Sequence, residues 1–153
     1  MKQLQLAIGM ALSALILLSI TTSSSDRSNW ITDFDTAKNT AAQEEKIVMM
    51  SFQGSDWCGN CRRLEKILFE NEEFKSFADS NLILLKVDFP MKKENKLSKE
   101  QTAHNDVLAD KYNKEGKFPL VLFFNSAGEK IGALSYPEKD ASAYISSIKK
   151  LIK

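Results

Sequence analysis

The chain of 153 residues contains two cysteines, Cys58 and Cys61, in a C-x-x-C spacing. On a helix this spacing places the two thiols about one turn apart. Thiols so close together can bind a metal ion, form a structural disulfide or exchange a disulfide with a substrate. The residues around the pair help to distinguish these three kinds of chemistry.

A metal site and a structural disulfide are the two alternatives to redox chemistry. Zinc needs about four ligands, and beside the two thiolates the chain offers one histidine, His104, and carboxylates. No second C-x-x-C occurs, so we expect no metal site. A structural disulfide would close a ring of only four residues. Loop entropy makes such a ring worth about 1.9 kcal/mol, which is low for a disulfide.

A redox-active dithiol fits the surrounding residues best. Cys58 begins a predicted helix, where unpaired backbone N–H groups and the helix dipole stabilise a thiolate. We therefore predict that Cys58 attacks a substrate disulfide and that Cys61, one turn later and facing inward, resolves the mixed disulfide. Gly59, between them, would let a substrate chain approach closely.

The cysteine pair follows the first of two predicted buried strands. Ile47 to Phe52 and Leu82 to Phe89 are apolar runs with the length of central strands. The pair begins a helix between them, so strand, helix and strand predict a βαβ unit with parallel strands and a right-handed crossover. Chemistry in open α/β sheets gathers at the carboxyl ends of strands, and the cysteine pair stands at such an end.

The other segments complete an α/β domain. Two runs separated by a turn sequence, Leu120 to Phe124 and Lys130 to Leu134, predict an antiparallel hairpin. Apolar periodicity and capping residues predict helices at Asp33 to Lys46, Asn71 to Ala78, Ser98 to Tyr112 and Asp140 to Ile152. The sum is a four-stranded mixed sheet, a βαβ unit plus an antiparallel ββα unit, with helices on both faces and a helix at the N-terminal end.

Two segments are predicted in more detail. The lysine-rich stretch from Met91 to Lys99 is expected to be a solvated loop. In the helix that follows it, we expect Ala103, Val107 and Leu108 to face inward. His104, on the same helix beside polar residues, is expected to be solvated.

The run Trp57-Cys58-Gly59-Asn60-Cys61 after a buried strand resembles the active-site motif of the thioredoxin superfamily. The preceding Phe52-Gln53-Gly54-Ser55-Asp56 and the leading Trp30-Ile31-Thr32-Asp33-Phe34 resemble exported bacterial thioredoxin-like proteins more than cytosolic thioredoxin. The resemblance extends from about Trp30 to the C-terminus. It implies a thioredoxin-like fold, a protein disulfide oxidoreductase and a substrate-binding role for Trp57.

A second matching site is Lys117-Phe118-Pro119-Leu120, just before the third strand. The resemblance implies that Pro119 is a cis-proline that faces the cysteine pair. It also implies that Phe118 pairs with the substrate backbone. Phe118 departs from the Thr or Val that is common in the family, so the balance between oxidase and reductase does not follow from this position.

Three further positions depart from the family pattern. By counting, Ser51 stands where thioredoxin has a buried Asp, and Leu84 stands where it has a Lys on the neighbouring strand. We therefore expect a drier core below the pair and a slower deprotonation of Cys61, assisted by Ser51 or water. Asn60 replaces the Pro that is common between the cysteines, a position that affects redox poise in the family.

Residues 1–25 are typical of a secretory signal peptide. Lys2 is the only charge ahead of Asp26, and Leu6 to Ile20 is an apolar run that small polar residues follow. As a helix this run would span about 22 Å, less than the roughly 30 Å of a hydrocarbon core. We expect cleavage before Asp26, and the alternative is an uncleaved membrane anchor. Residues 26–153 would then form a single domain. We expect this domain to be located in the periplasm or to be secreted.

Composition and charge limit the function further. The 43% hydrophobic content suits one globular domain, and 21 Lys+Arg against 20 Asp+Glu give no basic excess for a nucleic-acid partner. We predict a monomeric enzyme without a cofactor that acts on protein disulfides. We expect it to reduce them instead of forming them, because no helical insertion is large enough to form the peptide groove of an oxidase. The resemblance suggests an electron-donor relay in the membrane. The alternatives are a disulfide-forming oxidase and a binding module with little redox turnover.

Overall fold

The computed structural model describes residues 30–134 and 140–152, so the predicted signal segment lies outside the described residues. The helical elements are α1 (Phe34–Glu44), α2 (Gly59–Leu64), the π-helical segment η1 (Glu65–Phe69), α3 (Glu72–Asn81), the 3-10 turn η2 (Lys93–Asn95), α4 (Lys99–Tyr112) and α5 (Ala141–Leu151). The strands are β1 (Ile47–Gln53), β2 (Leu82–Asp88), β3 (Leu120–Phe124) and β4 (Lys130–Leu134). Their order along the chain is the predicted one.

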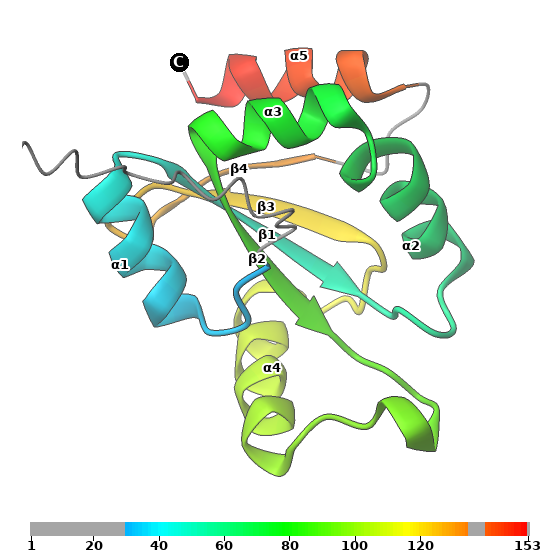
Figure 1. Ribbon diagram of the computed structural model, residues 1–153. Helices are drawn as coiled ribbons and strands as arrows, with labels where there is room; N and C mark the ends of the chain where they lie inside the picture. Colours follow the sequence, from blue (N-terminus) through cyan, green and yellow to red (C-terminus); the bar gives the residue numbers. More distant parts are fainter. Residues whose placement is uncertain (1–29, 135–139, 153) are drawn as a thin grey trace, which may run out of the picture.

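The four strands form one mixed sheet in the order β2-β1-β3-β4 (Figure 1). β1 and β2 are parallel, whereas β3 is antiparallel to both β1 and β4. The predicted sheet, with its parallel unit and its antiparallel hairpin, is therefore confirmed. Because β1 has a neighbour on each side, its carboxyl end is a firmly positioned place for a site.

Helices cover both faces of this sheet (Figure 1). Residues of α2, α3 and α5 pack in one core, and residues of α1 and α4 pack in the other. Successive side chains of a strand point to opposite faces, so β1 contributes to both cores. Met49 packs against α3 and α5, whereas Val48 and Met50 pack on the side of α1 and α4.

Four helices begin at predicted capping residues. Each cap accepts a hydrogen bond from the backbone N–H three residues later, at distances between 2.7 and 3.1 Å. The four capping residues are Asp33, Asn71, Ser98 and Asp140. A polar cap satisfies a backbone donor that would otherwise lack a partner, which is why these helices begin where they do.

The inward face of α4 differs from the prediction. Leu108 is buried, but Val107 is 66% exposed and Ala103 is exposed as well. The inward position is taken by Asn105, which is 2% exposed and whose amide donates to the carbonyl of Asp88 at 2.8 Å. Apolar periodicity could not show this, because a polar side chain can be buried when it has a hydrogen-bond partner.

His104 is also placed differently from the prediction. Its Nε2 accepts a hydrogen bond from the backbone N–H of Phe34 at 3.3 Å, so the side chain is not simply solvated. On the same helix, Gln101 donates to the carbonyl of Thr32 at 2.9 Å. These two contacts attach α4 to the segment that leads into α1.

Candidate active site

The cysteine pair lies at the carboxyl end of β1, where the chain turns into α2. The backbone N–H groups of Trp57 and Cys58 both donate to the carbonyl of Gly54, at 3.2 and 2.8 Å. A Cβ on Gly54 would overlap the indole ring of Trp57, so only glycine allows the ring to pack over this turn. The strand and the turn together determine where Cys58 lies.

Cys58 and Cys61 are joined by a disulfide bond, with an S–S distance of 2.10 Å and Cα atoms 5.2 Å apart. Cys58 is the N-cap of α2, and its Sγ accepts a hydrogen bond from the backbone N–H of Cys61 at 3.1 Å. Cys58 is 6% exposed and Cys61 is 2% exposed. Cys58 is therefore the sulfur nearer the surface, and it occupies the position at which helix N–H groups stabilise a thiolate.

The proline segment meets the cysteine turn at the same edge of the sheet. The Phe118–Pro119 peptide bond is cis, which confirms the conformation that the resemblance implied. Pro119 is followed by β3, whose first residue, Leu120, pairs with Phe52 near the end of β1. The ring of Phe118 lies 5.2 Å from the ring of Trp57, edge to face.

The tryptophan of the motif is both fixed and accessible. Trp57 Nε1 donates to the carbonyl of Phe89 at 2.6 Å, and 41% of the residue is exposed. The ring of Phe89 lies 5.6 Å from the ring of Phe118, so three aromatic residues adjoin one another beside the disulfide. No heavy atom lies within 4 Å of the place where a Cβ on Gly59 would be, so the first turn of α2 is open to an approaching chain.

The layer below the cysteines is more polar than the sequence indicated. Ser51 and Gln53 are buried on the α2 side of β1, and Gln53 Nε2 donates to Ser51 Oγ at 3.1 Å. The residue opposite Ser51 on β2 is Lys86, whereas Leu84 pairs with Met49. We expected Leu84 at the lysine position and a drier core, whereas the structure places a lysine, Lys86, opposite Ser51. Counting along the sequence failed because strand register depends on the pairing of the two strands.

A half-buried carboxylate lies on the same side of the sheet. Burial raises the pKa of Glu65 above its ordinary value of 4.5, and the negative charges of Glu70 and Asp88 raise it further. The positive charge of Lys86 acts in the opposite direction. Lys86 Nζ also lies 5.1 Å from the ring centroid of Trp30, in the leading segment of the domain.

Two aspartates hold the cysteine turn and the loop that faces it. Asp88, at the end of β2, accepts hydrogen bonds from the backbone N–H and the hydroxyl of Ser55, at 2.9 and 2.6 Å. Asp56 accepts from the backbone N–H groups of Met91 and Lys92, each at 3.0 Å. The turn is therefore fixed to the end of β2 and to the loop that follows it.

Asp56 also accepts a hydrogen bond from the side-chain amide of Asn95 at 3.0 Å. The hydrogen bond from Met91, followed by those from Asn95 and Lys92 and by the Lys92 charge, lowers the pKa of Asp56 below 3.8. The stretch from Met91 to Lys99 is thus exposed, as predicted, but it is attached to the cysteine turn. Sequence reasoning missed this because Asp56 and Asn95 are 39 residues apart, and their spacing carries no signal.

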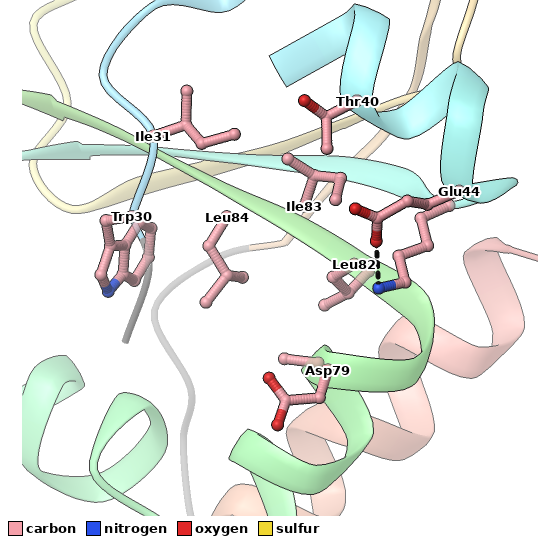
Figure 2. A pocket seen from close by; sticks show the side chains of 10 residues that line it. Trp30, Ile31, Thr40, Glu44, Asp79, Leu82, Ile83 and Leu84 are labelled. Atoms are coloured by element: carbon pink, nitrogen blue, oxygen red, sulfur yellow. Dashed lines mark hydrogen bonds and ion pairs between the residues drawn. The ribbon is translucent and has the colours of Figure 1, made fainter. Parts of the chain in front are cut away.

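A cavity of about 470 Å³ lies away from the cysteines, at the outer edge of β2, where Ile31 forms an isolated bridge with Leu85 (Figure 2). It is bounded by Trp30 and Ile31 from the leading segment and by Asp79 from α3. Glu44 is paired with Lys46 at 2.6 Å on its wall. Nothing in this lining adds a nucleophile or a metal-ligating cluster to the disulfide site.

Residues 30–134 and 140–152 contain neither a metal-binding cluster nor a membrane-spanning helix. No group of three or more His, Cys, Asp or Glu side chains in these ranges could hold a metal ion. No helix in the same ranges combines the length and the apolar character needed to cross a membrane.

Comparison with known proteins gives the following similarities. A family model described as Thioredoxin-like matches residues 29–126. The disulfide bond reductase DsbH of Chlamydia pneumoniae is 32% identical over 111 residues, which are 72% of this chain and 65% of that protein. The thiol:disulfide interchange protein DsbD of Actinobacillus pleuropneumoniae is 28% identical over 94 residues, which are 61% of this chain and 14% of that protein. The chain thus spans less than two thirds of each of these curated relatives.

A solved structure, described as DsbH oxidoreductase, superposes with a TM-score of 0.73 at 30% identity. The match covers 80% of this chain and 83% of that one.

Proposed function

This chain belongs to the thioredoxin-like family, and from that premise we propose that it is a thiol–disulfide oxidoreductase that reduces disulfides in other proteins. The observation that carries the proposal is the Cys58–Cys61 disulfide at the start of α2, together with a cis-proline, Pro119, whose preceding residue packs against Trp57. The similarity to a protein described as a disulfide bond reductase favours the reducing direction.

The reaction needs the dithiol form of the pair. The Cys58 thiolate attacks one sulfur of the substrate disulfide, which forms a mixed disulfide and releases the other substrate sulfur as a thiolate that takes up a proton. The Cys61 thiolate then attacks Cys58 Sγ and releases the second substrate sulfur. The substrate gains two electrons and two protons, and the enzyme is left with the Cys58–Cys61 disulfide.

The geometry suits this division of roles. Cys58 is the more exposed sulfur and has the helix N-terminus behind it, so it is the nucleophile in our proposal. Cys61 lies deeper and acts only once Cys58 is bound to substrate. Trp57, Gly59 and the Phe118–Pro119 segment surround the pair and would contact the substrate chain.

The oxidised enzyme must be reset by a dithiol donor. We propose that the protein acts as a monomer outside the cytoplasm, in the periplasm or secreted, because residues 1–25 have the pattern of an export signal. The donor is then a membrane protein that carries electrons outward. The signal pattern and the family support this part of the proposal.

Reduction of a disulfide-bonded protein by the purified enzyme, with dithiothreitol as donor, tests the activity. We expect Cys58→Ser to abolish turnover, because the attacking thiolate is gone. Cys61→Ser should instead accumulate the mixed disulfide between Cys58 and the substrate, which non-reducing electrophoresis detects. Undiminished turnover in Cys58→Ser would contradict the proposal, and no turnover in the unmodified protein would favour a binding module.

A further inference from the structure

A groove of about 390 Å³ opens next to the cysteine turn, between that turn, the segment after β2 and α4. We call it the aromatic groove. Its apolar lining consists of Trp57, Phe89, Pro90, Met91, Leu97 and Phe118. Its volume is within the range of roughly 300–1,000 Å³ that is usual for binding pockets.

The aromatic groove is continuous with the reaction site. Trp57 directly precedes Cys58, and Phe118 directly precedes the cis-proline. Both side chains form part of the groove wall, and their rings are 5.2 Å apart. A chain bound across the cysteine pair would therefore have this groove beside it.

The uncharged polar groups and the carboxylate on the groove wall already have partners within the protein. The carboxylate of Asp88 is bonded to Ser55, and the hydroxyl of Thr102 donates to the carbonyl of Ser98 at 2.9 Å. Asn105 donates to the carbonyl of Asp88 and accepts from Gln101. A polar ligand would gain little here, because hydrogen bonds to these groups would replace existing ones. The groove therefore suits an apolar occupant.

Apolar exposure in the described part of the chain is concentrated at this groove. Within residues 30–134 and 140–152, three large apolar side chains are strongly exposed: Trp57 at 41%, Met91 at 76% and Val107 at 66%. Trp57 and Met91 line the groove, and Val107 does not. Exposed apolar residues that gather beside a reactive site indicate a binding surface.

The groove is held in shape before anything binds. The indole of Trp57 is bonded to the Phe89 carbonyl, and Asp56 holds the backbone of Met91. Asn105 fixes the end of β2 from the other side. A preformed wall lowers the ordering cost of binding.

The groove lining contains one lysine, together with Asp88, whose carboxylate is bonded to Ser55. Lys96 is part of the lining, and Lys93 belongs to the same loop. Neither lysine forms an ion pair with another described residue. A carboxylate on the occupant would meet an unpaired positive charge at this place.

We propose that the aromatic groove binds a large apolar side chain close to the reacting cysteine of the substrate, and that Lys96 favours a carboxylate next to that side chain. This inference rests on the proposed function, and it names the class of polypeptide that the site reduces. Holding the side chain in the groove places the neighbouring substrate sulfur against Cys58, which raises the rate by positioning. The substrate disulfide is reduced by the same exchange, with Cys58 as the nucleophile and Cys61 as the resolving cysteine.

Three synthetic peptides, each a disulfide-linked dimer, test the proposal. The first has Asp-Phe before its cysteine, the second has Asp-Ser and the third has Lys-Phe. We expect kcat/KM to be about 10-fold or more higher for the first peptide than for the second. The Asp-Phe peptide should also be reduced faster than the Lys-Phe peptide. In Lys96→Gln, the rates for these two peptides should be closer to each other.

Two variants of the groove wall remove the apolar contact independently. Leu97→Ser and Met91→Ser should each lower the ratio of kcat/KM for the Asp-Phe peptide to kcat/KM for the Asp-Ser peptide. Met91 is exposed enough for its replacement to leave the fold intact. Val107→Ser is the matched control, because it removes an exposed apolar side chain outside the groove. An unchanged ratio in both groove variants, or no preference in the unmodified protein, would overturn the proposal.

Reduction of 2-hydroxyethyl disulfide separates this inference from the proposed function. That substrate has no side chain for the groove, so the groove variants should reduce it as fast as the unmodified protein does. Turnover of this disulfide without any peptide preference would overturn the groove alone. Absence of turnover with every substrate would overturn the proposed function and the inference together.

Discussion

Gln53 is the residue that most changes the chemistry below the cysteine pair. It is buried, it donates to Ser51, and it lies on the face of the sheet that carries α2. With Lys86 opposite Ser51 and the half-buried Glu65, it makes this face of the sheet more polar than an apolar layer would be. The predicted slow deprotonation of Cys61 was argued from an apolar layer, and that premise no longer holds.

Glu65 gives a prediction for stability at this scale. Its pKa is raised in the folded protein, chiefly by burial, so folding favours its protonated form. Glu65 therefore adds to the free energy of unfolding at acidic pH. This contribution is lost as the pH rises from 4.5, the pKa of Glu65 in the unfolded chain, through its higher pKa in the folded protein. We expect Glu65→Gln to become more stable relative to the unmodified protein as the pH rises from 4 to 7, measured by urea unfolding.

Glu73→Gln is the matched control for this experiment, because Glu73 is an exposed glutamate on the neighbouring helix α3. It removes a glutamate charge that is exposed instead of half-buried. If Glu65→Gln and Glu73→Gln responded alike, burial of Glu65 would not influence stability.

At the level of single residues, chemistry that is local in the sequence was predictable and chemistry that depends on pairing was not. Cys58, Cys61 and cis-Pro119 were identified because the residues next to them carry the motif. Lys86 was missed because its place opposite Ser51 follows from strand register. The burial of Gln53 could not be predicted, since nothing local in the sequence indicates it.

The elements position the site through a few long-range polar contacts. The strand and helix order was predictable from apolar periodicity, and so were four helix starts, because caps and turns are local signals. The attachment of the loop after β2 to the cysteine turn was not, since it joins Asp56 to residues 35 to 39 positions away. The same loop supplies Met91 and Leu97 to the aromatic groove.

Asp56 gives a prediction for this loop. Its pKa lies below 3.8, with the hydrogen bond from Met91 as the main cause. Asp56 therefore stabilises the fold fully at a pH above its pKa in the unfolded chain. This stabilisation is lost as the pH falls through the lower pKa that Asp56 has in the folded protein. By NMR, the amide protons of Met91 and Lys92 should titrate together in strong acid, with a midpoint below 3.8.

Asp56→Asn should abolish that common titration, because the amide has no charge to lose. Glu94→Gln, which changes an acidic residue within the same loop, should leave it in place. A midpoint at or above 3.8, or an unchanged titration in Asp56→Asn, would show that the carboxylate does not hold the loop.

The whole molecule is a mixed sheet covered on both faces, with the reactive pair at the carboxyl end of its central parallel strand (Figure 1). The chain has 21 basic and 20 acidic residues, so it has almost no net charge. The positive charge near the groove is therefore local and does not reflect an overall basic protein. The fold explains why the pair, the cis-proline and the groove meet at one edge. The direction of electron flow depends instead on small energies, since about 30 mV corresponds to about 1.4 kcal/mol for a two-electron couple.

The reduction potential of the Cys58–Cys61 pair is the most direct test of the proposed activity. The purified protein would be equilibrated in glutathione redox buffers, and its free thiols would then be counted. We predict a reducing value, closer to about −270 mV, as in thioredoxin, than to about −120 mV, as in a dedicated oxidase. A value near the oxidase end would contradict a reductase and would assign the protein to disulfide formation.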